Sequence, residues 1–255
     1  MILRAALCAT GPAMAQTAQS HDHGHAHSDA AKSVYAGYFD DAQVADRPLP
    51  DWASDWQSVY PLLRAGALDP MMATKAAKGD RTAAEYRAYY ETGYRTDVDC
   101  FVIAGDEVTF HGSGGAVHGH YASDGHEILT YAKGNRGLRF TFRKTGGNAA
   151  AAGFLQFSDH AIAPVRTGHY HLYWGDDRAA PLAEVTHWPT YHPAALGAEE
   201  IRAEMLWRTE PGFGRAPAQW LLNIGGAAIR PCLLRLRRFR CCVTNLPSPR
   251  VRGGP

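Results

Sequence analysis

The sequence has no long hydrophobic run, little cysteine and almost no net charge, and each of these shortages narrows the possibilities. No stretch approaches the ~20 apolar residues that a membrane-spanning helix requires, so we expect no membrane insertion. Five cysteines occur among 255 residues without the paired spacing of metal ligands. The sequence therefore predicts neither a disulfide framework nor a cysteine-based zinc site.

The near-zero net charge hides a difference between two parts of the chain. Residues 208–255 carry nine arginines and one acid, Glu210, for a net charge of +8, and because the whole chain sums to +1, residues 1–207 sum to −7. An acidic body argues against a nucleic-acid surface, so no nucleic-acid partner is expected. The basic segment also holds six prolines and six glycines without a hydrophobic period, so we expect a disordered tail. The alternative, a basic arm for nucleic acid or an anionic membrane, would give only non-specific binding.

Residues that can form a core are abundant. Of all residues, 45% are hydrophobic and 11% are aromatic, which is enough for one full domain with extensions. Residues 1–15 combine Arg4, a short apolar stretch and the small-x-small form Ala13-Met14-Ala15, so we interpret them as a signal-like leader. Residues 16–33 are expected to be flexible. They hold four histidines at alternate positions, which can wrap a metal ion or merely solubilise a linker; these are His21, His23, His25 and His27. The folded domain is then residues 34–207, followed by the tail 208–255.

Helical patterns precede and follow a β-rich centre. Residues 51–65 show apolar positions at helical spacing, and a second helix is marked by Thr82 as N-cap with Glu85 three residues later, followed by Gly93. A short helix is expected at Glu199–Leu206. Between them the apolar period is two, in runs at Val98–Ile103, Val108–Phe110, Val117–Tyr121, Ile128–Tyr131, Leu138–Phe142, Phe154–Phe157 and His169–Tyr173. Turn signals between the runs, such as Asp124-Gly125, indicate an antiparallel up-and-down barrel or a sandwich, and we favour a barrel.

Three histidines stand out within these runs. His169 and His171 alternate with Tyr170, so in a strand both imidazoles leave the same face. His160 closes the preceding apolar run, and a hairpin would return the chain alongside it. Three imidazoles suit Zn²⁺ and leave a fourth position for water or a carboxylate. We expect this site at the mouth or in the interior of the barrel.

Other polar residues near these histidines remain open as candidates. Four carboxylates are candidates for orienting an imidazole or for the fourth ligand position: Asp159, Asp176, Asp177 and Glu184. A second His-x-His, formed by His118 and His120, is either another metal site or part of a surface strand.

Taken together, these segments resemble the ZinT (YodA-like) family of periplasmic zinc-binding proteins. The resemblance runs from about Val34 to Leu206 and rests on a series of short motifs: 56-WQSVYP-61, Glu85-Tyr86 with Tyr89-Tyr90, Gly93-Tyr94 with Thr96-Asp97, 128-ILTY-131, Arg136-Gly137, 156-QFSDH-160 with 162-IAP-164, His169-Tyr170-His171, 188-WPTY-191 and Glu204-Met205. It implies a lipocalin-like (calycin) barrel with extra helices. It also implies that His160, His169 and His171 are zinc ligands, with water, an exogenous anion or a nearby carboxylate in fourth place.

The resemblance has further implications for function. It implies a periplasmic protein that captures Zn²⁺ and passes it to the substrate-binding protein of a zinc ABC importer, with Cd²⁺, Ni²⁺ or Co²⁺ also accepted. We expect it to act as a monomer. The histidine-rich segment of residues 21–27 matches a feature of the family, whereas the tail from Arg208 has no counterpart in it.

Two other classes of function compete with metal capture. A zinc-dependent hydrolytic enzyme would also use three histidines and a bound water. It would need a positioned general base, and the adjacent residues Ser158, Asp159 and His160 cannot form a triad, so we expect no enzyme. A lipocalin-like binder of an apolar ligand would need an empty barrel, whereas crowded aromatic strands would fill a small one.

Overall fold

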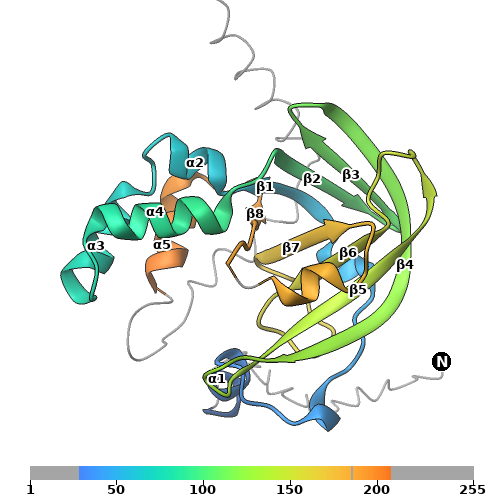
Figure 1. Cartoon of the computed structure of the whole chain (residues 1–255), viewed down its shortest axis with the longest axis horizontal. Coiled ribbons are helices and arrows are strands. Elements are labelled where there is room, and N and C mark those ends of the chain that lie inside the picture. The colour runs from blue at the N-terminus through green and yellow to red at the C-terminus, as the bar shows by residue number, and fades with distance from the viewer. Residues whose placement is uncertain (1–28, 185, 208–255) are drawn as a thin grey trace, which may run out of the picture.

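Eight antiparallel strands form a closed barrel in which each strand pairs with the next and β8 returns to β1 (Figure 1). The computed structural model describes residues 29–184 and 186–207. The strands are β1 Ser54–Ser58, β2 Val98–Ala104, β3 Glu107–Gly112, β4 Gly115–Thr130, β5 Arg136–Gly147, β6 Phe154–Ser158, β7 Tyr170–Gly175 and β8 Thr190–Pro193. The predicted antiparallel barrel with leading and trailing helices is confirmed.

The helices of the described chain lie outside the barrel, and most of them gather at one side of it (Figure 1). They are α1 Asp29–Tyr35, α2 Tyr60–Arg64, α3 Asp69–Lys78, α4 Ala83–Tyr94 and α5 Ala198–Trp207, with 3-10 turns η1 Asp41–Gln43, η2 Leu49–Trp52 and η3 Ala180–Ala183. Helices α2 to α5 share a second apolar cluster that includes Leu63, Met71, Tyr94 and Ile201. Helix α1 lies apart from them, near the turn between β4 and β5 (Figure 1). There Arg136 N–H donates to the Gly37 carbonyl at 2.8 Å.

Aromatic side chains fill the barrel interior. Phe101 on β2 contacts Trp174 on β7 and Tyr191 on β8, with ring centroids 5.8 and 4.7 Å apart. Trp56 on β1 contacts Tyr170 on β7, with ring centroids 4.6 Å apart. Because Tyr170, Leu172 and Trp174 turn inward on β7, the alternate residues of that strand point out of the barrel. The interior is therefore a packed core, and the outer face of β7 is available for other roles.

Helix α4 begins at the capping residues that the sequence predicts. Thr82 Oγ1 accepts from Glu85 N–H at 3.2 Å, and Glu85 Oε2 accepts from Thr82 N–H at 2.7 Å, which is the predicted capping box of α4. Gly93 does not follow this helix but lies within it. A Cβ at Gly93 would stand 2.3 Å from Cζ2 of Trp188, so only glycine allows this close approach. Helix α5 confirms the predicted C-terminal helix.

Two local predictions are wrong for reasons that lie outside the local sequence. The helix expected from residue 51 is interrupted, because Ser54–Ser58 forms β1 and pairs with both β2 and β8. Barrel closure, which requires this strand, outweighs the helical spacing of its apolar residues. Asp124-Gly125 is not a turn between strands; β4 continues through it with a register shift between Ser123 and His126. This β-bulge bends the long strand without ending it.

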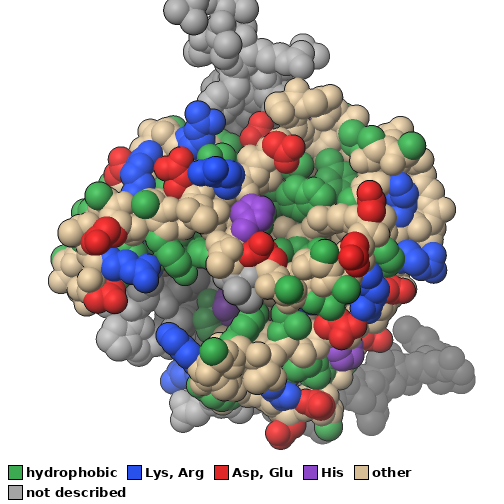
Figure 2. Space-filling view, in the orientation of Figure 1, with side chains coloured by type: hydrophobic (Ala, Val, Ile, Leu, Met, Phe, Trp, Pro, Cys, Tyr) green, Lys and Arg blue, Asp and Glu red, His purple; other side chains and the backbone are tan. Residues whose placement is uncertain are grey.

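Cysteine behaves differently from the prediction at one position. Cys100 is disulfide-bonded, whereas no partner for it was expected from the sequence. Among the helices that the structure describes, none is long and apolar enough to cross a membrane. Charged side chains of both signs are scattered over the face shown in Figure 2, without a broad area of one sign.

Candidate metal site

The three predicted histidines come together on the outer wall of the barrel, under the helices. His169 immediately precedes β7, His171 lies on it, and His160 follows β6 by two residues. Ring centroids of His160 and His169 are 5.9 Å apart, and those of His169 and His171 are 6.4 Å apart. The prediction that they meet at the mouth or in the interior is wrong. Tyr170 and Leu172 occupy the core, so the alternation of the strand sends His171 outward.

Helical side chains cover this outer face and leave a cavity of about 190 Å³ between helices and barrel. The histidines form its floor. Its other lining residues come from α1, α3, α4, α5 and β8: Tyr35, Met71, Lys75, Tyr90, Tyr94, Thr190, His192 and Met205. Packing of helices against the outer wall thus places these strand residues in a partly open cavity.

A fourth histidine and a glutamate, neither singled out from sequence, complete the group. His192 on β8 stacks on His169, with centroids 5.2 Å apart and planes inclined by 17°. Glu204 of α5 lies between them: its Oε1 is 3.4 Å from Nδ1 of His169, and its Oε2 is 3.0 Å from Nδ1 of His192. Glu204 follows Ile201 by three residues, so it lies on the buried face of α5. A glutamate on a buried helix face was the signal available in the sequence.

The hydrogen bonds of the imidazoles fix which ring nitrogen carries the proton. His160 Nδ1 lies 3.1 Å from the Tyr35 carbonyl oxygen, which can only accept, so Nδ1 carries the proton. His171 Nδ1 lies 2.8 Å from Thr190 Oγ1, and that hydroxyl already donates to the Trp188 carbonyl at 2.9 Å. His171 Nδ1 is therefore also a donor. In both rings Nε2 keeps its lone pair, which is the state that a metal ligand needs.

Burial and neighbouring groups favour a neutral His171 and an ionised Glu204. Burial lowers the pKa of His171 well below its ordinary value, and the nearby imidazoles of His169 and His160 lower it further. For Glu204, burial opposes ionisation, but hydrogen bonding and charge from His169 and His192 outweigh it and hold the pKa of the carboxyl far below its usual range. A neutral imidazole beside a carboxylate is a suitable donor set for a divalent cation.

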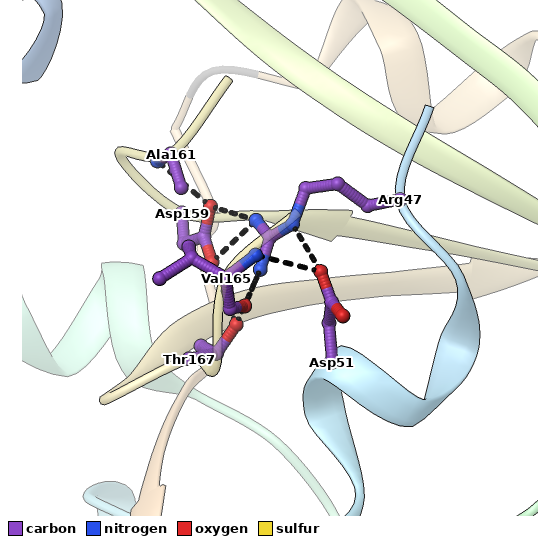
Figure 3. Close-up of polar contacts among 6 residues, drawn as sticks. All are labelled: Arg47, Asp51, Asp159, Ala161, Val165 and Thr167. Atoms are coloured by element: carbon purple, nitrogen blue, oxygen red, sulfur yellow. Dashed lines mark hydrogen bonds and ion pairs between the residues drawn. The ribbon is translucent and has the colours of Figure 1, made fainter. Parts of the chain in front are cut away.

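A buried arginine holds the loop that carries His160 (Figure 3). Nη1 of Arg47 donates to both carboxylate oxygens of Asp159, at 2.7 and 2.8 Å, and its Nε donates to Asp51 at 3.0 Å. Nη2 donates to the Val165 carbonyl and to Thr167 Oγ1, each at 2.8 Å. Since Asp159 directly precedes His160, this network fixes the start of the loop from which the imidazole projects.

The four carboxylates proposed from sequence serve local structure instead. Asp159 binds Arg47, as described above. Asp176 accepts from Gly153 N–H at 2.9 Å, and Asp177 accepts from Ala179 N–H at 2.8 Å. Glu184 Oε1 accepts from the backbone of Thr186 and His187. The carboxylate against the histidines is Glu204, which reaches them from a helix distant in sequence.

The second His-x-His lies apart from this site. His118 and His120 lie on β4, with ring centroids 6.5 Å apart, and His120 contacts Asp106 at 3.3 Å. The N-terminal histidines of residues 21–27 fall outside the described residues. In the described part of the chain, no three or more His, Cys, Asp or Glu side chains converge closely enough to hold a metal ion in the present arrangement.

Comparison with known proteins identifies the family to which the domain is similar. The profile of the ZinT family, described as periplasmic lipocalin-like zinc-recruitment, matches residues 30–208. The probable metal-binding protein YrpE of Bacillus subtilis (strain 168) is 50% identical over 176 residues, covering 69% of this chain and 70% of YrpE. The zinc-binding protein AdcA of Streptococcus pyogenes is also 50% identical, over 182 residues, but only 35% of its length is covered.

Solved structures agree with this assignment. The Zn(II)-bound ZinT-like domain of Streptococcus pneumoniae AdcA is 45% identical and superposes with a TM-score of 0.66, covering 69% of this chain and 98% of that domain. Zn(II)-bound AdcA from the same species gives a TM-score of 0.65 and is covered over 38% of its chain. The family profile covers well over half of the chain and the fold agrees, and we conclude that this chain belongs to the ZinT family.

Proposed function

We propose that this protein captures Zn²⁺ through His160, His169 and His171 and supports zinc uptake by passing the metal to the substrate-binding protein of a zinc ABC importer. The observation that carries the proposal is that the three imidazoles line one cavity and that each has Nδ1 near an oxygen of the protein. His160 and His171 commit Nδ1 to scaffold oxygens and keep Nε2 for a metal. His169 turns its Nδ1 toward Glu204 in the same way.

The geometry is close to what a zinc ion requires. With Zn–N bonds of about 2.0–2.1 Å and tetrahedral angles, ring centroids around one ion would stand roughly 5 Å apart. The centroid separations of 5.9 and 6.4 Å exceed this by about an ångström, a change within the reach of side-chain rotation. We therefore expect the imidazoles to draw together as zinc binds.

An open coordination position suits transfer better than a closed site does. Three histidines leave a fourth place that can exchange, whereas four protein ligands would hold zinc as a structural metal. Under this proposal Glu204 and His192 support His169, and Glu204 is the nearest carboxylate for the fourth place. Imidazole donors do not exclude Cd²⁺, Ni²⁺ or Co²⁺. The relatives named zinc-binding and the family's zinc-recruitment description support zinc as the main cargo.

The place of action follows from the family. We propose a periplasmic protein, exported by the leader of residues 1–15, that acts as a monomer without catalytic activity. The histidines of residues 21–27 lie eight residues or more before Tyr35, whose carbonyl binds His160. We propose that they collect metal for the site. The aromatic core described above argues against the alternative of an apolar ligand inside the barrel.

Calorimetric titration with zinc at neutral pH tests this function. The titrations use full-length protein in which His21, His23, His25 and His27 are all replaced by alanine, so that the N-terminal histidines contribute no signal. We expect one tight zinc per chain, and loss of this binding in the His169→Ala, His171→Ala double variant. The matched control is His118→Ala with His120→Ala, which removes an identical His-x-His from β4 and should leave binding unchanged.

Other outcomes would count against the proposal. If the background protein binds no zinc, metal capture by the barrel fails. If the β4 pair removes binding as strongly as the β7 pair does, the site is assigned to the wrong strand. Transfer is tested separately, by mixing zinc-loaded protein with a purified zinc importer substrate-binding protein and measuring whether the metal moves.

A further inference from the structure

A second and larger cavity lies next to the histidine site, on the outer wall formed by β5, β6 and β7. Its volume is about 670 Å³, and both His160 and His171 line it as well as the smaller cavity. The two histidines therefore form a boundary between the cavities. Several of its other walls are apolar or aromatic, including Phe39, Tyr131 and Trp188.

One wall residue, Arg139, is a buried cation that has no counter-ion among the residues that the structure describes. Only 2% of Arg139 is exposed, and its Nε has no hydrogen-bond partner. Its guanidinium lies 3.7 Å from the ring centroid of Tyr173, and its Nη2 donates to the Glu184 carbonyl at 3.3 Å. No residue within 29–184 or 186–207 forms an ion pair with Arg139. A buried charge without its opposite is costly, so an anion supplied from outside would be stabilised here.

The carboxylate of Glu184 is engaged elsewhere, although the backbone of this residue contacts Arg139. The backbone carbonyl of Glu184 contacts Arg139, but its carboxylate accepts hydrogen bonds from Thr186 and His187. Arg47, the other buried arginine, shows the contrasting case, since it pairs with two aspartates. Within the described part of the chain, Arg47 thus has carboxylate partners, whereas Arg139 has none and lines a cavity.

Strand register brings Arg139 to the histidines. Phe140 pairs with Phe157, so Arg139 lies one position beyond that pair, next to Ser158, which in turn pairs with His171. The three residues lie side by side on the outer faces of adjacent strands, spaced by roughly 4.8 Å per strand. A molecule of a few atoms in this cavity can therefore reach both the guanidinium and the histidine site.

We propose that this cavity binds a small organic carboxylate, which Arg139 holds through its guanidinium and which lies beside the histidine site. A guanidinium binds a carboxylate by paired charge-assisted hydrogen bonds, and the aromatic walls fit an apolar body attached to it. The proposal of an anion site depends only on Arg139 and the cavity, and it does not depend on the proposed zinc binding. A second consequence rests on the proposed function: a carboxylate in this place attracts a metal ion, so zinc and the anion each strengthen the binding of the other.

Benzoate is the first ligand to test, because it combines a carboxylate with a flat apolar ring. Its binding to the full-length protein is measured by calorimetry in a buffer free of carboxylates, beside neutral benzamide, which has the same shape without the charge. We expect benzoate to bind and benzamide to bind at least about tenfold more weakly, since the charge-assisted bonds are lost. Equal binding of the two would overturn the proposal without need of any variant.

Variants then locate the site. Arg139→Gln should weaken benzoate at least about tenfold, Arg139→Lys should weaken it less, and Arg143→Gln, which changes a more exposed arginine on the same strand, should have no effect. Circular dichroism checks that each variant is folded. If Arg139→Gln does not fold, the comparison of Arg139→Lys with wild type decides, because the bidentate geometry is lost while the charge is kept. Unchanged affinity in the folded Arg139 variants would overturn the proposal.

A final titration separates this inference from the proposed function. Zinc should raise benzoate affinity about fivefold or more, and the His169→Ala variant, which changes a histidine that lines only the smaller cavity, should lose that increase while keeping the metal-free benzoate affinity. If zinc does not bind but benzoate binding still depends on Arg139, the proposed function fails and the anion site stands. If zinc binds tightly but benzoate binding is absent or independent of Arg139, the anion site is refuted and the proposed function stands.

Discussion

Replacing Arg47 with methionine tests whether a buried ion network positions the proposed zinc site. Arg47 is 1% exposed, and its guanidinium forms five hydrogen bonds that join Asp51, Asp159 and the loop through residue 167. It also lies 4.2 Å from the ring centroid of Trp52. Methionine fills a similar volume but leaves Asp159 without its cation.

The expected cost follows from that unpaired carboxylate. Removing one partner of a buried ion pair typically costs about 3–5 kcal/mol. Asp159 would keep hydrogen bonds from Ala161 N–H and Thr167 Oγ1, so we expect a loss near the lower limit, about 3 kcal/mol. For a domain of this size, that corresponds to a fall in melting temperature of roughly 6–12 °C. Because His160 follows Asp159, we also expect zinc affinity to fall about tenfold.

Two measurements decide the matter. Urea unfolding of metal-free protein gives the free energy of unfolding, and zinc titration of the folded variant gives the affinity. Arg143→Met serves as control, since this side chain is 55% exposed and should change neither quantity appreciably. In a double-mutant cycle, Asp159→Asn combined with Arg47→Met should cost less than the sum of the single changes. Additive losses, or a loss below about 1 kcal/mol for Arg47→Met, would refute the reasoning.

Three further changes have definite expected outcomes. Because the pKa of His171 is lowered in the folded state, the unfolded chain binds a proton that the folded one does not. This contribution to the stability of the metal-free protein should therefore be fully present above about pH 6.5 and decrease below it, by up to about 1.4 kcal/mol per pH unit. Urea unfolding from pH 7.5 to 5.5 should show that the free energy of unfolding depends less on pH in His171→Gln than in the unchanged protein. An equal pH dependence in the two proteins would contradict this. Gly93→Ala should destabilise by about 1–3 kcal/mol through its clash with Trp188, while Gly114→Ala, which meets nothing within 4 Å, should be neutral in the same thermal melts. Thr82→Ala should cost about 1 kcal/mol in urea unfolding by removing the N-cap of α4, and no change would mean that the cap is dispensable.

Local sequence determined those features that depend on near neighbours in the chain. The capping box of α4 is visible because its two partners are three residues apart. The alternation of apolar residues predicts strands, and alternation also places His169 and His171 on one face with Tyr170 opposite. The residues that resemble the ZinT family led to the correct family and to a barrel.

Only the tertiary structure decided which face the histidines occupy and what surrounds them. Alternation along a strand predicts that two side chains lie on the same face, but it does not say whether that face is the inner one. In this barrel the aromatic core occupies the inner face, so the histidines lie on the outer face. His192 and Glu204 join the site only because β8 closes the barrel and α5 packs on its outer wall. Arg47 reaches Asp159 across 112 residues. Contacts between residues so distant in sequence arise from packing of whole elements, and no local pattern encodes them.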